Sequence, residues 1–312
     1  MSNALHCRKA VSLLLALGII LSLLAVPALA EAPVPIVLTQ YDGSTVTLDA
    51  EPQHICVPSY AVAMTAYALG LNMTSIATST RPMPEDMLAL PDVGSQNSPN
   101  FELIKAYDTD LVLSSTRFME TTKSFFDAQG IPSCYVDITL YSDSRRNIEM
   151  LGKAFGKTEA MEALLSDMDA REAAVLEKAM GHEGQTIAIL FGTGKSFLFN
   201  TPDSYIGEMA GMLGLQNIIE SSPEAPSSVA FSTEQLVLLD PDIIVRYAHG
   251  ANWGEVNESF ESMFADNAAF ANLKAFQTGR VYSLDEDLFT ANPGPGAIDA
   301  LEALAEILFG AE

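Results

Sequence analysis

The chain has 312 residues and a formal net charge of −24 at pH 7, with 40 acidic side chains against 16 Lys and Arg. A protein this acidic repels nucleic acid and anionic lipid surfaces, so both are poor partners for it. If an N-terminal signal of 30 residues is removed, about 280 residues remain, which is enough for two modest lobes, each with its own core.

The first 30 residues are typical of a secretory signal peptide. Arg8 and Lys9 precede an apolar run at residues 11–26, and Ala28-Leu29-Ala30 is a small-residue cleavage site. We therefore predict export with cleavage after Ala30, and an uncleaved membrane anchor is the alternative. Cys7 lies before the apolar run and not at its end, so it is not placed like a lipid-modified cysteine.

Removal of the signal leaves two cysteines, each within an apolar run that resembles a strand. Cys56 and Cys134 could pair in an exported protein, but spacing alone does not show a disulfide. Buried free thiols are at least as consistent with these surroundings, and the CxxC pattern of metal or redox sites is absent from the sequence.

The first half of the exported chain alternates short strands with helices. Two strands flank Asp42-Gly43, which is a strong hairpin signal. Further strands are predicted at residues 55–57, 73–77, 111–113 and 134–136. Helices are predicted at residues 61–69, from 99 onward and at 118–129, and loops are predicted at residues 79–84 and from residue 91.

A long helix is predicted near the middle of the chain, at residues 158–180. Its apolar residues recur with helical spacing, no Pro interrupts it, and Gly156 and Gly181 bracket it. At roughly 1.5 Å per residue it spans about 34 Å, which is long enough to join two lobes.

The second half repeats the alternation. Strands are predicted at residues 186–191, 196–199, 243–246 and 281–284, and helices at residues 205–213, 233–238, 253–264 and 298–309. Strands separated by helices favour mostly parallel sheets. We predict an α/β protein of two doubly wound α/β lobes, at residues 31–157 and 182–312, joined by a single long helix at 158–181.

In open parallel sheets, ligands bind at loops beyond the carboxyl ends of the strands. The candidate loops contain Ser59-Tyr60, residues 81–83, residues 114–117 and residues 247–249. In this chain they are the places where a functional site is expected.

Motifs for covalent or nucleotide chemistry are lacking in the sequence. Residues 192–196 end in Gly-Lys-Ser after a strand, but a phosphate-binding loop needs a Gly where Ile189 stands, so we predict a turn between two strands. Neither a GxSxG nucleophile context nor a GxGxxG run is present.

His249 differs from the other histidines because it lies in a predicted strand-to-helix loop. Tyr247 and Gly250 adjoin it and Trp253 follows. A neutral imidazole among aromatic neighbours is a ready axial ligand for haem iron, although a His bonded to its own loop is the commoner situation.

Several segments in this order resemble the iron-complex and cobalamin class of periplasmic binding proteins, the capture subunits of ABC importers. They include Pro58-Ser59, residues 68–71, residues 99–102, residues 110–112 and residues 279–282. The segments at residues 90–94, 204–207, 240–244, 246–250 and 285–289 are further similar to the haem-receptor lipoproteins of Gram-positive bacteria. The resemblance covers nearly all of the exported chain and implies two lobes joined by one helix.

The resemblance implies that His249, in the Ala-His-Gly turn, ligates haem iron. The second iron ligand of that family is a Met shortly before the Ser-Pro step, and Asn97 stands there in this chain. Three readings remain open: His249 binds alone, Met83 or Tyr60 substitutes for the Met, or the ligand is not haem. The lipid-modified cysteine of those lipoproteins is also missing.

The resemblance further implies one surface Glu on each lobe for the permease, and Glu102 and Glu234 lie at the matching positions. Acidic groups of haem or of a siderophore would need local cations. Candidates at the predicted loops are Arg81, Arg117 and Arg246.

We therefore predict a monomeric, exported substrate-binding protein that passes haem or a related iron complex to an ABC permease with its ATPase. It would be no enzyme and would carry no intrinsic cofactor. A siderophore or cobalamin carrier of the same class is the alternative, and an exported enzyme on a doubly wound fold is a remote one. The residues expected around the ligand are His249, Tyr60, Met83, Arg81, Asn97, Arg117, Tyr247, Arg246 and Trp253.

Overall fold

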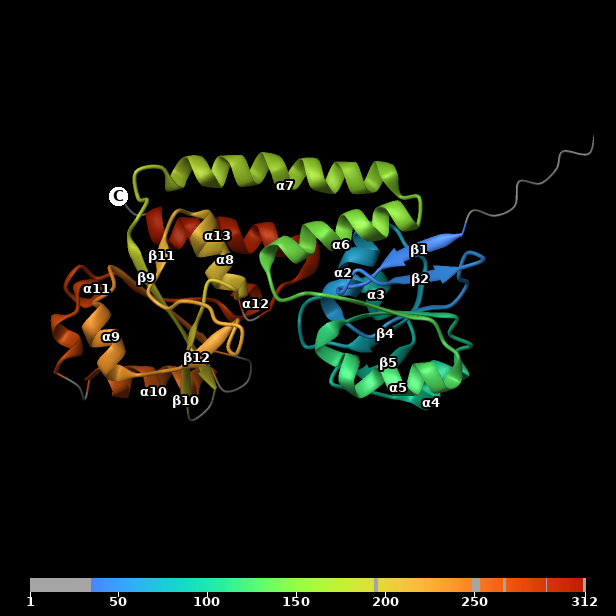
Figure 1. The fold of residues 1–312 in the computed structure, drawn as a ribbon, viewed down its shortest axis with the longest axis horizontal. Coiled ribbons are helices and arrows are strands. Elements are labelled where there is room, and N and C mark those ends of the chain that lie inside the picture. Colours follow the sequence, from blue (N-terminus) through green and yellow to red (C-terminus); the bar gives the residue numbers. More distant parts are fainter. Residues whose placement is uncertain (1–34, 194–195, 249–252, 266–267, 290, 311–312) are drawn as a thin grey trace, which may run out of the picture. The chain divides into compact units, whose positions relative to one another are not determined.

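The computed structural model describes residues 35–193, 196–248, 253–265, 268–289 and 291–310, and His249 lies outside these ranges. The described residues belong to one compact unit that begins at Pro35. They form two lobes, each built on a six-stranded sheet (Figure 1). No helix within the described ranges combines the length and the apolar character needed to cross a bilayer.

The first lobe contains a sheet whose strand order is β6-β5-β4-β3-β7-β8. Its strands are β3 (Ile55–Val57), β4 (Met73–Thr78), β5 (Asp92–Ser95), β6 (Ser98–Pro99), β7 (Leu111–Ser115) and β8 (Ser133–Val136). All neighbouring pairs are parallel except β5 with β6. The helices are α2 (Tyr60–Ala68), α3 (Glu85–Leu88), α4 (Phe101–Ala106) and α5 (Met119–Gln129).

The predicted hairpin is confirmed, because β1 (Ile36–Thr39) pairs with β2 (Thr45–Leu48) around Gly43, whose φ is +81°. The prediction of a loop from residue 91 is wrong. Residues 92–95 instead extend the sheet as β5, whose backbone pairs with β4 on one side and β6 on the other.

The second lobe contains a mixed sheet in the order β12-β10-β9-β13-β14, with β11 also on β9. Its strands are β9 (Thr186–Thr193), β10 (Ser196–Asn200), β11 (Gln216–Asn217), β12 (Ser228–Ala230), β13 (Ile243–Ala248) and β14 (Val281–Ser283). Strands β9, β11, β13 and β14 pair in parallel. Its helices are α8 (Tyr205–Met212), α9 (Thr233–Leu239), α10 (Trp253–Ala265), α11 (Lys274–Gln277) and α12 (Glu286–Phe289).

Two expectations for this lobe are tested by strand pairing. Residues 196–200 form β10, which pairs antiparallel with β9, and not the helix that follows a phosphate-binding loop; the turn predicted between these strands, at residues 194–195, lies outside the described ranges. The prediction that Arg246 and Tyr247 lie at or beyond the end of the strand is wrong. Both lie inside β13, which continues to Ala248 because it pairs with β9 along its whole length.

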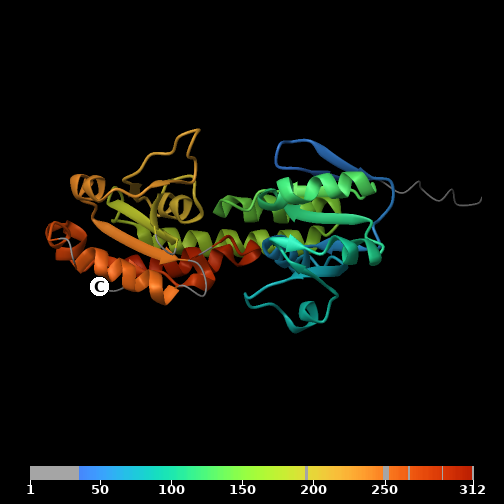
Figure 2. The same ribbon diagram turned by 90° about the horizontal axis from the view of Figure 1, so that it is seen from below.

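The long helix is confirmed as α7 (Thr158–Ala179), and it packs along two partners, α6 (Tyr141–Ala154) and α13 (Ala297–Phe309). Figures 1 and 2 show α7 extending over both lobes, with α13 alongside the part of α7 that lies over the second lobe. Met161, Met168 and Val175 are buried along its inner face. The contact with α6 is so close that a Cβ on Gly152 would lie 2.6 Å from the Cβ of Met161.

One apolar cluster runs through both lobes. It joins residues of the first sheet, such as Val57, to the three long helices and to residues of the second sheet, such as Val245. The lobes are therefore connected by continuous packing as well as by the chain. Cys56 and Cys134 are buried free thiols, so the open question of a disulfide is answered against pairing.

Candidate functional site

The parallel strands of the first lobe bring three of the candidate loops, and the turn that holds Asn97, to one edge of the sheet. Tyr60 follows β3, Arg81 and Met83 follow β4, Asn97 follows β5, and Arg117 follows β7. Because these four strands are neighbours and run in the same direction, their carboxyl ends lie together. The sequence prediction of this edge is supported by the topology.

Tyr60 and Arg81 form the central contact of this edge. The Arg81 guanidinium lies over the Tyr60 ring, 4.5 Å from its centroid, and the Tyr60 hydroxyl donates to the carbonyl oxygen of Pro82 at 2.9 Å. Burial raises the pKa of Tyr60, although Arg81 opposes that shift. Tyr60 is therefore held as a neutral phenol that braces the loop carrying Arg81.

The other candidates of the first lobe differ in exposure. Met83 is partly buried and packs against the main apolar cluster. Asn97 is exposed in the two-residue turn between β5 and β6. Arg117 is exposed in the short 3-10 helix Thr116–Phe118. Sequence reasoning missed Gln96, whose side-chain oxygen lies 3.4 Å from the backbone nitrogen of Tyr60.

Two candidates of the second lobe have a structural role inside β13. The Tyr247 hydroxyl donates to Asn200 Oδ1 at 2.5 Å, and its ring packs on Phe191. Burial raises the pKa of Tyr247, so it stays protonated.

Arg246 is buried and already neutralised. It pairs with Glu261, donates to Ser283 Oγ at 3.0 Å, and lies over the rings of Phe260 and Phe264. The expectation of a cation at a loop is therefore corrected for Arg246.

His249 lies outside the described residues, but its position in the chain is fixed by its neighbour. Ala248 is the last described residue of β13, and His249 follows it in the sequence. Trp253 begins α10. Among the described residues, no group of three His, Cys, Asp or Glu side chains could hold a metal ion.

Arg81 connects the carboxyl edges of the two sheets. Its guanidinium donates to the backbone oxygen of Asp287 at 2.9 Å and to that of Ala291 at 3.4 Å. Asp287 lies in α12, which follows the carboxyl end of β14 in the second lobe. The backbone oxygens of the last turn of a helix have no partner within the helix, so Arg81 caps α12 from the first lobe.

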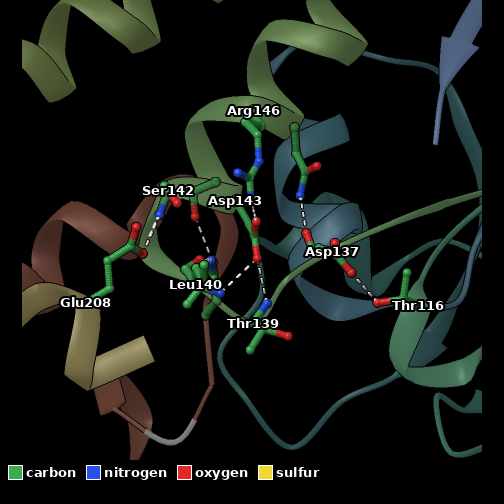
Figure 3. A network of polar contacts seen from close by, with 11 residues as sticks. Thr116, Asp137, Thr139, Leu140, Ser142, Asp143, Arg146 and Glu208 are labelled. Atoms are coloured by element: carbon green, nitrogen blue, oxygen red, sulfur yellow. Dashed lines mark hydrogen bonds and ion pairs between the residues drawn. The ribbon is translucent and has the colours of Figure 1, made fainter. Parts of the chain in front are cut away.

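A second connection between the lobes lies at the start of α6 (Figure 3). The backbone N–H of Ser142 donates to the Glu208 carboxylate of α8 at 2.9 Å. Asp143 accepts the N–H groups of Thr139 and Leu140 at 2.8 Å each, and it pairs with Arg146. Carboxylates thus cap the N-terminus of α6, and Glu208 does so from the second lobe.

Asn292 completes this connection where the chain returns toward the first lobe. It is 2% exposed, accepts from Ser144 Oγ at 2.7 Å and from the Gly294 N–H at 2.8 Å, and donates to the Leu140 oxygen. A Cβ on Gly294 would lie 2.6 Å from the backbone oxygen of Ala61 in α2. We call Leu140, Ser142, Ser144, Glu208, Asn292 and Gly294 the joint.

The two expected permease contacts occupy matching places on different lobes. Glu102 is the second residue of α4 and Glu234 the second residue of α9, and both are exposed. Each helix has a polar N-cap, Asn100 and Ser232, whose side chain accepts a backbone N–H of the first turn.

Comparison with known proteins agrees with this architecture. Residues 55–288 match the family described as periplasmic binding protein. The chain is 27% identical over 250 residues to the high-affinity heme uptake system protein IsdE of Staphylococcus aureus, which covers 79% of this chain and 83% of that protein.

Two solved structures share the fold. An ABC transporter substrate-binding protein from Listeria monocytogenes EGD-e is similar with a TM-score of 0.75 and 28% identity, covering 84% of this chain and all of that one. The S. aureus IsdE complexed with heme gives a TM-score of 0.73 and 26% identity, covering 83% of this chain and all of that one. The paired α/β lobes, the long connecting helix and the match over three quarters of the sequence lead to one conclusion: the chain belongs to the periplasmic binding protein family.

Proposed function

We propose that the chain is the exported, monomeric substrate-binding protein of an ABC importer. It captures haem or a related iron complex at the carboxyl edges of the two sheets and delivers it to a permease driven by an ATPase. Its task is binding and release, with no chemical step and no resident cofactor. The observation that carries this proposal is the similarity to a heme uptake protein over 79% of the chain, and His249 follows Ala248 of β13 in the sequence.

His249 is the proposed iron ligand, because a neutral imidazole can coordinate haem iron at an axial position. For a second ligand, Met83 is the better of the two substitutes. A tyrosine binds iron as tyrosinate, whereas the Tyr60 hydroxyl donates to Pro82 and its pKa is raised by burial. Met83 offers a thioether beside the same loop.

Acidic groups of the ligand have two candidate cations in the first lobe, Arg81 and Arg117, whose guanidinium groups can bind carboxylates in a bidentate manner. Arg117 is exposed, and Arg81 lies at the seam between the lobes. Asn97, Tyr247 and Trp253 remain proposed neighbours of the ligand, from the turn after β5, from β13 and from the start of α10.

Glu102 and Glu234 are the proposed contacts with the permease, one for each lobe. Both carboxylates are exposed at helix starts, where basic residues of a partner can reach them. Replacing both by Lys should abolish uptake while leaving ligand binding by the isolated protein unchanged.

One observation favours a second candidate ligand. Asn97 stands where the resemblance implies a Met, and its exposed amide is a weak ligand for haem iron. A siderophore or corrinoid supplies the iron or cobalt ligands itself, so it could bind at the same edges without coordination by the protein.

The decisive experiment is an absorbance titration with haemin of the chain from Glu31 onward. A saturable one-to-one Soret shift that His249→Ala abolishes or moves supports haem capture with His249 as ligand. His54→Ala is the matched control, because His54 is exposed just before β3, at the amino end of the sheet, and the variant should titrate like the parent.

Other outcomes decide between the alternatives. A Soret shift that is unchanged in His249→Ala would assign the iron to Met83 or Tyr60, which Met83→Leu and Tyr60→Phe separate. If no saturable shift occurs, the haem proposal fails, and siderophores and corrinoids are tested next by quenching of Trp253 fluorescence.

Export with cleavage after Ala30 is part of the proposal, and it rests on Arg8, Lys9 and the apolar run that follows them. Mass spectrometry of the exported protein should give an N-terminus at Glu31. A retained N-terminus would instead show that the segment serves as an anchor.

A further inference from the structure

Arg81 is partly buried, and it differs from Arg171 and Arg246 in what neutralises it. Arg171 and Arg246 each have a carboxylate partner in an ion pair. Within the described ranges, no carboxylate lies within ion-pair distance of Arg81, and the acceptors of its guanidinium are two backbone oxygens. Burial is the largest influence on the pKa of Arg81 and lowers it, against the fields of Tyr60, Tyr205 and Asp287.

This arrangement places an incompletely compensated cation at the seam between the lobes. A charge withdrawn from water is normally paired, because the loss of hydration is costly unless an opposite charge compensates, and Arg81 is partly withdrawn from water. Neutral carbonyl oxygens supply only part of that compensation. A carboxylate would bind the guanidinium more strongly, through charge-assisted and bidentate hydrogen bonds.

The same two hydrogen bonds connect the lobes. Asp287 belongs to α12, which packs on β13 and α13 of the second lobe, whereas Arg81 follows β4 of the first lobe. Tyr60 holds the Arg81 loop in place through Pro82 and through its ring. When Arg81 turns away from α12, the terminal oxygens of that helix lose their cap, and the lobes lose this connection.

We propose that Arg81 is a latch, which ties α12 to the first lobe in the ligand-free protein and is released when an acidic group of the ligand takes over its guanidinium. Release by the ligand rests on the proposed function, whereas the connection between α12 and the first lobe does not. Release of the latch couples occupancy of the site to the separation of the lobes, which is the property that a permease can read. By linkage, the latch and the acidic group oppose each other's binding to Arg81.

The first test measures the distance between the lobes without any ligand. Spin labels are placed at Glu120→Cys on α5 and Leu238→Cys on α9, two exposed positions on different lobes, in the chain from Glu31 onward. The native thiols stay unlabelled, because burial raises the pKa of Cys56 to about 11 and that of Cys134 to about 12. Electron–electron double resonance then gives the distance distribution.

The latch predicts that Arg81→Gln broadens or shifts this distribution. Arg280→Gln is the matched control, because Arg280 donates to Gln185 within the second lobe, and its distribution should equal that of the parent. Arg81→Lys, which keeps the charge but loses the planar fork, should fall between the two. If the distance distributions of Arg81→Gln and the parent coincide, the latch is overturned. Circular dichroism checks that each variant is folded.

The second test compares haemin with its dimethyl ester, which lacks the acidic groups. The parent should bind haemin roughly tenfold more tightly than the ester, within the usual range of coupling between sites, and Arg81→Gln should reduce that ratio to about one. Only haemin should change the distance distribution of the parent. Equal distance changes with haemin and ester would overturn release by the acidic group. If neither compound shifts the Soret band, haem is excluded as the ligand, and the distance measurement without ligand still tests the connection between Arg81 and α12.

Discussion

The two lobes are connected by two helix caps of opposite sign, and their surroundings differ. At the joint, Glu208 of the second lobe caps the N-terminus of α6, and the buried amide of Asn292 satisfies three groups around it. At the latch, Arg81 of the first lobe caps the end of α12 with no described carboxylate in ion-pair distance. Buried polar groups that satisfy one another's hydrogen bonds hold one geometry. A cation with only neutral acceptors can exchange them for a carboxylate, which binds it more strongly.

The largest effect on this comparison should come from Gly294→Ala in the joint. Gly294 has a φ of +77°, and an added Cβ would lie 2.6 Å from the backbone oxygen of Ala61. We expect the free energy of unfolding to fall by about 2–4 kcal/mol, from the left-handed backbone and the clash together. The measurement is urea denaturation followed by circular dichroism.

Gly279→Ala separates the two causes. Gly279 has a similar φ of +70°, but an added Cβ would meet nothing within 4 Å. It should cost only about 1–2 kcal/mol, the part due to backbone conformation. Equal losses at both glycines would show that the contact of Gly294 with α2 contributes nothing.

The next largest effect should come from Asn292→Ala. It leaves Ser144 Oγ, the Leu140 oxygen and the Gly294 N–H without their partner in a buried place, which should cost about 2–3 kcal/mol. A double-mutant cycle with Ser144→Ala measures how much of that loss belongs to the pair. A coupling energy near zero would contradict the view of the joint as a mutually satisfied network.

The contrast between joint and latch also explains what the sequence could predict. Strands β3, β4 and β7 and helix α7 were recognisable because their apolar spacing is local. Helix α6 was not, because its N-cap residue, Leu140, is apolar, and its capping carboxylates come from Asp143 and from Glu208 of the other lobe. Strand β5 was hidden by Pro91 and Gly94, and its pairing with β4 overrides those turn signals.

For the site, the edge of the first sheet could be predicted because strand ends are readable and parallel topology brings them together. Tyr60 and Arg81 follow from that reasoning. The acceptors of Arg81 do not, because a backbone oxygen has no side-chain signature and Asp287 is 206 residues away. Arg246 was misjudged because its neutralising partner, Glu261, lies on a later helix, so the strand continues through a charged residue.

Arg171→Gln should have a smaller effect, because it removes exposed ion pairs that fasten α7 to α13. Arg171 pairs with Asp299 and Glu302, and both carboxylates are exposed. We expect a loss of about 1 kcal/mol at pH 7, against a few tenths for the control Lys153→Gln, which breaks a pair within α6.

The pH dependence of this difference has a defined sign. The hydrogen bond from Arg171 lowers the pKa of Glu302 below the ordinary value of 4.5. The stabilisation is therefore present above pH 4.5 and is lost as the pH falls through the lower folded-state pKa. Urea titrations at pH 7 and pH 3 should show the difference between parent and Arg171→Gln shrinking; a constant difference would mean that Arg171 acts through packing alone.

The smallest effect on stability should come from Arg81→Gln, which is the sharpest contrast with the joint. The substitution removes two hydrogen bonds but also removes the cost of holding an incompletely compensated cation in a partly buried place, and a neutral amide can still donate to a carbonyl oxygen. We expect the free energy of unfolding to change by less than about 0.5 kcal/mol in either direction, although the distance between the lobes changes. A loss of unfolding free energy as large as that of Asn292→Ala would show that Arg81 stabilises the fold as the joint does. It would contradict the view that Arg81 gives up its contact with α12 to a ligand.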